Sequence, residues 1–178
     1  VKVDDLPTFD IEYIFLNIRA KSIGEDIKLT VTCPDDKKTE VPVTIYVDEI
    51  EVVRPEGHTK DIVLSKDMTL RMKYPSLSQF VSNNFDTNDD PDVFVDKTFK
   101  LVADCMDTVF TKEEAWDSKD YTSDERKQFI EQLNSKQYKD VEKFFATMPK
   151  LSHTIEIVNP NTKKKSSIVL EGLADFFG

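Results

Sequence analysis

The sequence predicts an α+β fold in which a helical middle lies between two β-hairpins. Residues 27–47 and 151–170 each carry apolar side chains at every second position on both sides of a polar turn, a pattern typical of hairpins. Residues between about 91 and 148 carry apolar side chains at helical spacing instead. The chain has 178 residues, 39% of them apolar, which is enough for a buried core of ordinary size.

The first element is a helix over residues 8–22. Thr8 follows Pro7 and can cap the free backbone donors of the first turn. The helical spacing is set by four apolar residues, Ile11, Ile14, Phe15 and Ile18. Gly24 is expected to end this helix, because glycine readily adopts the left-handed backbone that follows a helix.

The first hairpin pairs residues 27–33 with residues 41–47 around the polar turn 34–39. Three shorter strand-like runs follow, at Glu49–Val53, Asp61–Leu64 and Met68–Tyr74. Pro75 then suits the first turn of a short helix that carries Leu77, Phe80 and Val81.

A pair of helices and one longer helix are expected in the middle of the chain. The longer helix opens at Asp90-Pro91, after a polar loop over Asn83–Asp92. Its inner stripe is predicted to comprise Phe94, Thr98, Leu101, Val102, Cys105 and Val109. The charged segment Lys112–Tyr121 is expected to be irregular and mobile.

The helix pair begins at a capping box, Thr122-Ser123-Asp124-Glu125. This box starts a helix with Phe129, Ile130 and Leu133, and Ser135 is expected to cap the next helix. That second helix carries Tyr138, Val141, Phe144, Phe145 and Met148. Pro149 is expected to stop it.

The chain closes with a hairpin of Leu151–Val158 and Ser166–Leu170, followed by the tail 171–178. We therefore expect three regions: 1–74 with the first helix, the hairpin and short strands, 75–150 with the helices, and 151–178 with the last hairpin and tail. The last region is expected to fold as one unit with residues 27–48.

A formal net charge of -10 bears on the partners of this chain. An acidic surface repels nucleic-acid phosphates and anionic membranes, so neither is expected as a partner. The sequence contains no apolar run long enough to cross a membrane. Cys105 is expected to be a small buried hydrophobe, and the spacing of Cys33 and Cys105 allows a disulfide without demanding one. The chain does not begin with Met, so a truncated or processed product is expected.

Residues that could carry catalysis or bind an ion are sparse. The four glycines form no nucleotide-binding loop, and His58 and His153 lie far apart without a neighbouring nucleophile in the sequence. Asp86–Asp90 resembles the start of a calcium loop. However, Pro91 and Lys97 stand where such a loop needs Gly and a bidentate Glu. A capped polar loop is the preferred interpretation.

Four stretches together resemble the baseplate hub and hub-assembly proteins of T-even-type bacteriophages. They are residues 9–25 (FDIEYIFLNIRAKSIGE), 129–133 (FIEQL) followed by Gln137-Tyr138, 144–153 (FFATMPKLSH) and 170–177 (LEGLADFF). The resemblance covers about residues 1 to 178. Members of this family usually carry a further N-terminal segment, which also favours truncation here.

The resemblance also implies a degenerate zinc ribbon. Some relatives carry a C-x-x-C pair in each hairpin turn, and the matching positions here hold Cys33, Asp36, Asn159 and Thr162. Zinc sites of this kind need four thiolate or imidazole ligands, and one thiol remains. No zinc and no other cofactor is therefore expected, and strand pairing and packing should hold the hairpins.

The role implied by the resemblance is non-enzymatic. The chain is expected to act as a chaperone-like factor in baseplate hub assembly in the host cytoplasm, binding other hub or tail proteins. Two alternatives are a permanent subunit of the hub in the virion and, more remotely, a tail-associated hydrolase. The residues expected to bind the partner are Leu173, Phe176 and Phe177. They could instead close the core of this chain. The sequence leaves the partner, its stoichiometry and the oligomeric state open.

Overall fold

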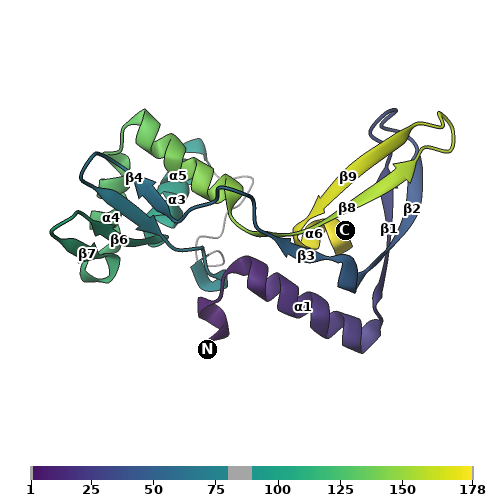
Figure 1. Cartoon of the computed structure of the whole chain (residues 1–178), viewed down its shortest axis with the longest axis horizontal. Coiled ribbons are helices and arrows are strands. Elements are labelled where there is room, and N and C mark those ends of the chain that lie inside the picture. Colours follow the sequence, from purple (N-terminus) through teal and green to yellow (C-terminus); the bar gives the residue numbers. More distant parts are fainter. Residues whose placement is uncertain (1, 80–89, 178) are drawn as a thin grey trace. The chain divides into compact units, whose positions relative to one another are not determined.

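The computed structural model describes residues 2–79 and 90–177, and it divides the chain into two compact units (Figure 1). Unit 1 comprises Val1–Thr8 and Pro55–Met148, and unit 2 comprises Phe9–Arg54 and Pro149–Gly178. Both units combine helices with antiparallel sheets, which confirms the α+β class. The expected division into three regions stays a prediction.

Unit 2 contains both predicted hairpins. Its elements are α1 (Thr8–Ile23), β1 (Asp26–Thr32), β2 (Glu40–Tyr46), the 3-10 turn η2 (Val47–Glu49), β3 (Glu51–Val53), β8 (Lys150–Val158), β9 (Lys165–Glu171) and α6 (Gly172–Phe177). Strands β1 and β2 pair with each other, and β3, β8 and β9 form a second antiparallel sheet in that order. The expected tail is therefore a short helix.

The core of unit 2 is built from strand residues of both hairpins, from three residues next to the strands (Cys33, Val47 and Ile50), and from one residue each of α1 and α6. Its members are Leu16, Ile27, Val31, Cys33, Ile45, Val47, Ile50, Leu151, Ile155, Ile157, Leu170 and Phe176. The period-two pattern of the sequence puts one set of strand side chains on the inner face. The hairpins thus share one apolar core.

Unit 1 is a four-stranded antiparallel sheet with three longer helices. Its elements are η1 (Val3–Asp5), β4 (Asp61–Val63), β5 (Thr69–Met72), α3 (Pro91–Asp104), β6 (Met106–Phe110), β7 (Ala115–Asp117), η3 (Ser118–Asp120), α4 (Ser123–Glu131) and α5 (Ser135–Thr147). The strand order is β4-β5-β6-β7. The core comprises Ile62, Leu64, Leu70, Met72, Val102, Ala103, Cys105, Met106, Ile130, Val141 and Phe144.

His58 packs into an aromatic stack beside this core. Its ring lies 5.7 Å from the ring of Tyr74 and 5.4 Å from that of Phe144. Its Nδ1 lies 2.9 Å from the hydroxyl of Thr147, and its Nε2 lies 3.0 Å from the hydroxyl of Tyr74. Burial, followed by the nearby charge of Lys60, lowers the pKa of His58. The neutral ring is therefore favoured as a structural group.

Two predictions about the middle of the chain are wrong. Lys112–Tyr121 is not irregular, because β7 and η3 occupy most of it and β7 pairs with β6. Val109 lies in β6 rather than on the preceding helix, which ends at Asp104, and Phe94 is about half exposed rather than inward-facing. Periodicity alone missed β7, because a three-residue strand has too few positions to show a period of two.

The helix boundaries agree better with the sequence. Asp90 caps α3 through a hydrogen bond from the backbone N–H of Asp92, with Pro91 at the first position. The capping box of Thr122 and Glu125 starts α4 as predicted. Asn134, rather than Ser135, caps α5, and its side-chain oxygen accepts hydrogen bonds from the backbone of residues 136 and 137.

Some predictions concern residues outside the described ranges. Phe80 and Val81 of the expected short helix belong to the undescribed segment 80–89, as does most of the calcium-like loop Asp86–Asp90. Of the described helices, none combines the length and the apolar character that crossing a membrane requires.

Candidate functional site

The side of α1 that faces away from the core of unit 2 is apolar. Leu16 faces inward and is fully buried. On the opposite side, Ile14, Phe15 and Ile18 are 45%, 50% and 60% exposed, and Ile11 continues the row at helical spacing. The stripe that predicts this helix in the sequence therefore lies mostly at the surface. Large apolar side chains grouped on one exposed face are characteristic of interaction surfaces.

Helix α6 extends this surface through Phe177. The Phe177 ring meets the Phe15 ring edge-on, at a centroid distance of 6.2 Å. The guanidinium of Arg19 lies 4.5 Å from the centre of the same ring, a favourable cation–π distance. We call the group Ile11, Ile14, Phe15, Ile18 and Phe177 the α1–α6 surface.

The three residues expected to bind a partner have different positions in the structure. Phe176 is 1% exposed and belongs to the core of unit 2. Leu173 and Phe177 are partly buried and pack against that core. Phe176 thus packs in the core of this chain, which is the alternative that the sequence left open. Phe177, in contrast, also reaches the surface. Partner binding by these residues stays a prediction.

The start of α6 is fixed against α1 by Gly172 and Glu12. Gly172 has a φ of +70°, a conformation that side chains with a Cβ disfavour. The carboxylate of Glu12 accepts a hydrogen bond from the backbone of Leu173, and burial raises its pKa. These contacts hold the first residues of α6 against α1.

The two hairpin turns of unit 2 meet at a polar cluster around Asn159, which is 1% exposed. Its amide nitrogen donates to the carboxylates of Asp35 and Asp36 at 3.0 Å. Its amide oxygen accepts from the backbone N–H groups of Asn161 and Thr162. The hydroxyl of Thr162 also donates to Asp35. Three of the four positions compared with zinc ligands therefore join in hydrogen bonds.

Zinc does not fit this cluster. Cys33 supplies its only thiol, and burial raises the pKa of that thiol, which disfavours the thiolate that zinc needs. The amide nitrogen of Asn159 is a donor that points at the carboxylates and cannot bind a cation. In the part of the chain that the structure describes, no three His, Cys, Asp or Glu side chains are grouped to hold a metal ion.

The two turns share one backbone geometry. The carbonyl of Cys33 accepts a hydrogen bond from the N–H of Lys37, and the carbonyl of Asn159 accepts one from the N–H of Lys163. Lys37 and Lys163 both have positive φ, 54° and 62°. Cys33 and Asn159 are therefore equivalent positions, and each is buried at the start of its turn.

Unit 1 carries a separate pocket of about 450 Å³ between the β6–β7 side of the sheet and α4. Apolar and aromatic side chains make up most of its lining: Met68, Met106, Val109, Trp116, Tyr121 and Phe129. Trp116 lies directly opposite Val109 in the pairing of β6 with β7. The volume is in the range of pockets that bind small molecules or protein side chains.

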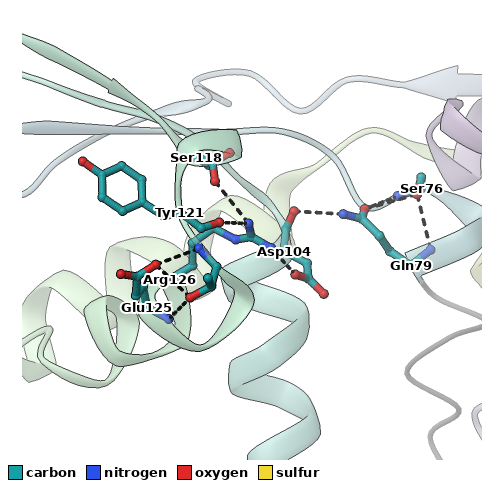
Figure 2. Close-up of polar contacts among 8 residues, drawn as sticks. Ser76, Gln79, Asp104, Ser118, Tyr121, Glu125 and Arg126 are labelled. Carbon is teal, nitrogen blue, oxygen red and sulfur yellow. Dashed lines mark hydrogen bonds and ion pairs between the residues drawn. The ribbon is translucent and has the colours of Figure 1, made fainter.

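Arg126 holds one wall of this pocket in place (Figure 2). Its guanidinium donates to the backbone carbonyls of Ser118 and Tyr121 at 3.1 and 2.9 Å, and to the carboxylate of Asp104 at 2.9 Å. The Arg126 and Asp104 side chains are 20% and 19% exposed. Such a partly buried, hydrogen-bonded ion pair fixes geometry more firmly than a surface pair does. The network ties α3, η3 and the start of α4 together.

The sequence interpretation missed both the α1–α6 surface and the pocket. Helical spacing identifies an apolar stripe but does not say which side of the helix packs against the core. That side is set by Leu16, which packs in one core with residues of both hairpins. The pocket depends on β7, for which the sequence offered one signal, the single Trp of the chain in a charged segment.

Of the three comparisons with known proteins, one gives a match. Neither the comparison with curated proteins nor that with solved structures gives a significant match. The family model described as T4 bacteriophage base plate protein matches residues 1–178. The chain therefore belongs to the T4 bacteriophage base plate protein family.

Proposed function

We propose that this protein is a non-enzymatic assembly factor of the baseplate hub, and that it holds another hub or tail protein on the α1–α6 surface. Membership of the base plate family supports a role among baseplate proteins. The observation that carries the proposal is the exposed apolar stripe of α1. It has the i, i+3, i+4, i+7 spacing of helices that dock into a groove of a partner.

The free energy of burying apolar surface favours a partner that covers the exposed stripe of α1. Burying a large apolar side chain contributes about 1.5–3 kcal/mol, so Ile14, Phe15 and Ile18 together offer several kcal/mol to a partner that covers them. The net charge of -10 opposes pairing of two copies through the same face. An acidic protein with one apolar stripe suits binding to a different chain.

The test is co-expression with the other hub proteins, followed by affinity purification of this chain and identification of what accompanies it. Ile18→Glu places a charge in the stripe and should reduce recovery of the partner at least about tenfold, a loss of about 1.4 kcal/mol. The matched control is Val169→Glu on β9, where the replaced side chain is 54% exposed. Equal recovery with the two variants would contradict the proposal.

The alternative of a permanent virion subunit predicts a different fate for the protein. An assembly factor should be missing from purified mature particles, because it leaves once its partner is incorporated. A structural subunit should be present in stoichiometric amount. Quantitative mass spectrometry of particles decides between the two roles, and stoichiometric presence would refute the assembly-factor proposal while leaving the docking surface intact.

The remote alternative, a hydrolase, has little support from the histidines. The hydroxyl of Thr147 beside His58 donates its proton to the carbonyl of Lys143 at 2.7 Å. The His58 ring must therefore donate to Thr147, so it cannot act as a base toward that hydroxyl. His153 contacts the backbone carbonyl of Glu49. Turnover of cell-wall or nucleotide substrates that a single carboxylate substitution abolishes would restore this alternative.

We further propose that the paired hairpins act as a metal-free counterpart of a zinc ribbon. The shared turn geometry and the Asn159 cluster support this, since hydrogen bonds there connect the turns that zinc would otherwise connect. Purified protein should therefore contain far less than one zinc per chain, and chelator should leave its melting temperature unchanged. Stoichiometric zinc would contradict this proposal.

A further inference from the structure

We propose that the pocket of unit 1 binds a large apolar side chain presented by an extended, basic segment of a partner protein. This site lies in unit 1 and does not depend on the α1–α6 surface of unit 2. Four observations carry the inference: the lining of the pocket, the hydrogen bonds that hold its wall, the charge of the segment beside it and the strand at the sheet edge.

The lining suits an apolar side chain. Met106 and Val109 of β6, Trp116 of β7 and Phe129 of α4 contribute apolar and aromatic surface to a space of about 450 Å³. Methionine side chains adapt to different shapes because they are unbranched and polarizable. An aromatic or long aliphatic side chain is the kind of group that gains most from such a pocket.

The wall is pre-organised. Arg126 connects Asp104 to the backbone of Ser118 and Tyr121. The first turn of α4 is fixed by the capping box, in which Glu125 accepts a hydrogen bond from the backbone N–H of Thr122 at 2.8 Å. Because the wall is already held in place, binding a ligand costs less free energy for ordering the side chains and loops of the pocket.

The segment that contributes Trp116, Ser118, Tyr121 and Glu125 to the pocket is acidic. Between residues 111 and 125, six exposed carboxylates face solvent alongside two exposed lysines. The carboxylates belong to Glu113, Glu114, Asp117, Asp120, Asp124 and Glu125, and the lysines are Lys112 and Lys119. Arg126 adds no free positive charge, because Asp104 pairs with it. Charge complementarity therefore selects a basic segment and disfavours a second copy of this acidic chain.

The sheet offers a place for an extended segment. Strand β7 is last in the order β4-β5-β6-β7, and within the described residues it pairs with β6 only. An added strand can use the free backbone groups of such an edge while every second side chain enters a neighbouring pocket. Trp116, at the centre of β7, lines the pocket, so a side chain from an added strand lies within reach of it.

The experiment uses the full chain and its own fluorescence, because Trp116 is the single Trp. Three capped peptides serve as probes: Lys-Thr-Lys-Phe-Lys-Thr-Lys, the same peptide with Gly for Phe, and Glu-Thr-Glu-Phe-Glu-Thr-Glu. The basic Phe peptide should change the Trp116 emission and bind at least about tenfold more tightly than the other two. Its affinity should fall as NaCl rises to about 0.3 M.

Gln128→Phe is the decisive variant. Gln128 is exposed on α4 and lines the pocket, so Phe there should fill it and weaken binding of the basic Phe peptide at least about fivefold. Lys139→Phe, at an exposed position on α5, is the matched control and should bind as the wild type does. Equal affinity of the three peptides, absence of binding, or unchanged binding by Gln128→Phe would each overturn the proposal.

Discussion

At the scale of single residues, Asn159 shows how a buried amide can connect two turns that are far apart in the sequence. It donates to Asp35 and Asp36 across more than 120 positions of the chain. Hydrogen bonds to charged groups contribute about 1.5–3 kcal/mol. The hydrogen bond from Asn159 is also the main reason why the pKa of Asp35 is lowered.

Asn159→Ala should therefore lower the free energy of unfolding by about 2–3 kcal/mol at neutral pH. The cost should shrink in acid, because a carboxyl with a lowered pKa stabilises the fold above its ordinary pKa of 3.8 and loses that contribution as pH falls below it. Urea unfolding at pH 7 and at about pH 3 measures both effects. Asn161→Ala, which removes one exposed hydrogen bond to Thr39, is the control and should cost less than about 1 kcal/mol. A cost that stays constant with pH would contradict this explanation.

At the scale of elements, α6 combines packing and exposure in two adjacent residues. Phe176 fills the core of unit 2, whereas Phe177 lies between Arg19 and Phe15 near the surface. Successive helical residues point about 100° apart, so one short helix can close a core and still contribute to a surface.

Phe176→Ala should cost about 3–5 kcal/mol of stability, as large-to-small changes in cores do. Phe177→Ala should cost less, about 1–2 kcal/mol, because its ring is only partly buried. Denaturant unfolding of both variants tests this order. Phe177→Ala should still reduce recovery of the partner in the co-expression assay. Equal destabilisation by the two substitutions would show that the ring of Phe177 is buried as deeply as that of Phe176.

The elements also show where sequence patterns succeed and fail. The hairpins, α1 and the capping box of α4 were predictable, because each depends on residues close together in the chain. Strand β7 was not, since it is defined by backbone pairing of Trp116 with Val109 rather than by its own composition.

At the scale of the whole molecule, the excess of negative charge affects stability. A net charge of -10 over 178 residues destabilises compact states through self-repulsion. Most ion pairs of the described residues involve exposed side chains, and such pairs contribute little each.

Raising NaCl from about 10 mM to 300 mM should therefore increase the melting temperature by a few degrees, because screening weakens repulsion among carboxylates more than it weakens the few exposed pairs. Calorimetry at constant pH measures this, and KCl should act equally if screening is the cause. A decrease in melting temperature with salt would mean that attractive pairs outweigh the net charge.

The sequence by itself determined the α+β class, both hairpins, most helix boundaries and the resemblance to a family that the comparison confirmed. These follow from local spacing, turn residues and contiguous motifs. Only the tertiary structure decided which side of α1 is exposed, that Phe176 is core, and that residues of β6, β7 and α4 line a common pocket. The physical reason is that burial depends on which distant residues fill the space around a side chain, and a periodic pattern contains no information about those partners.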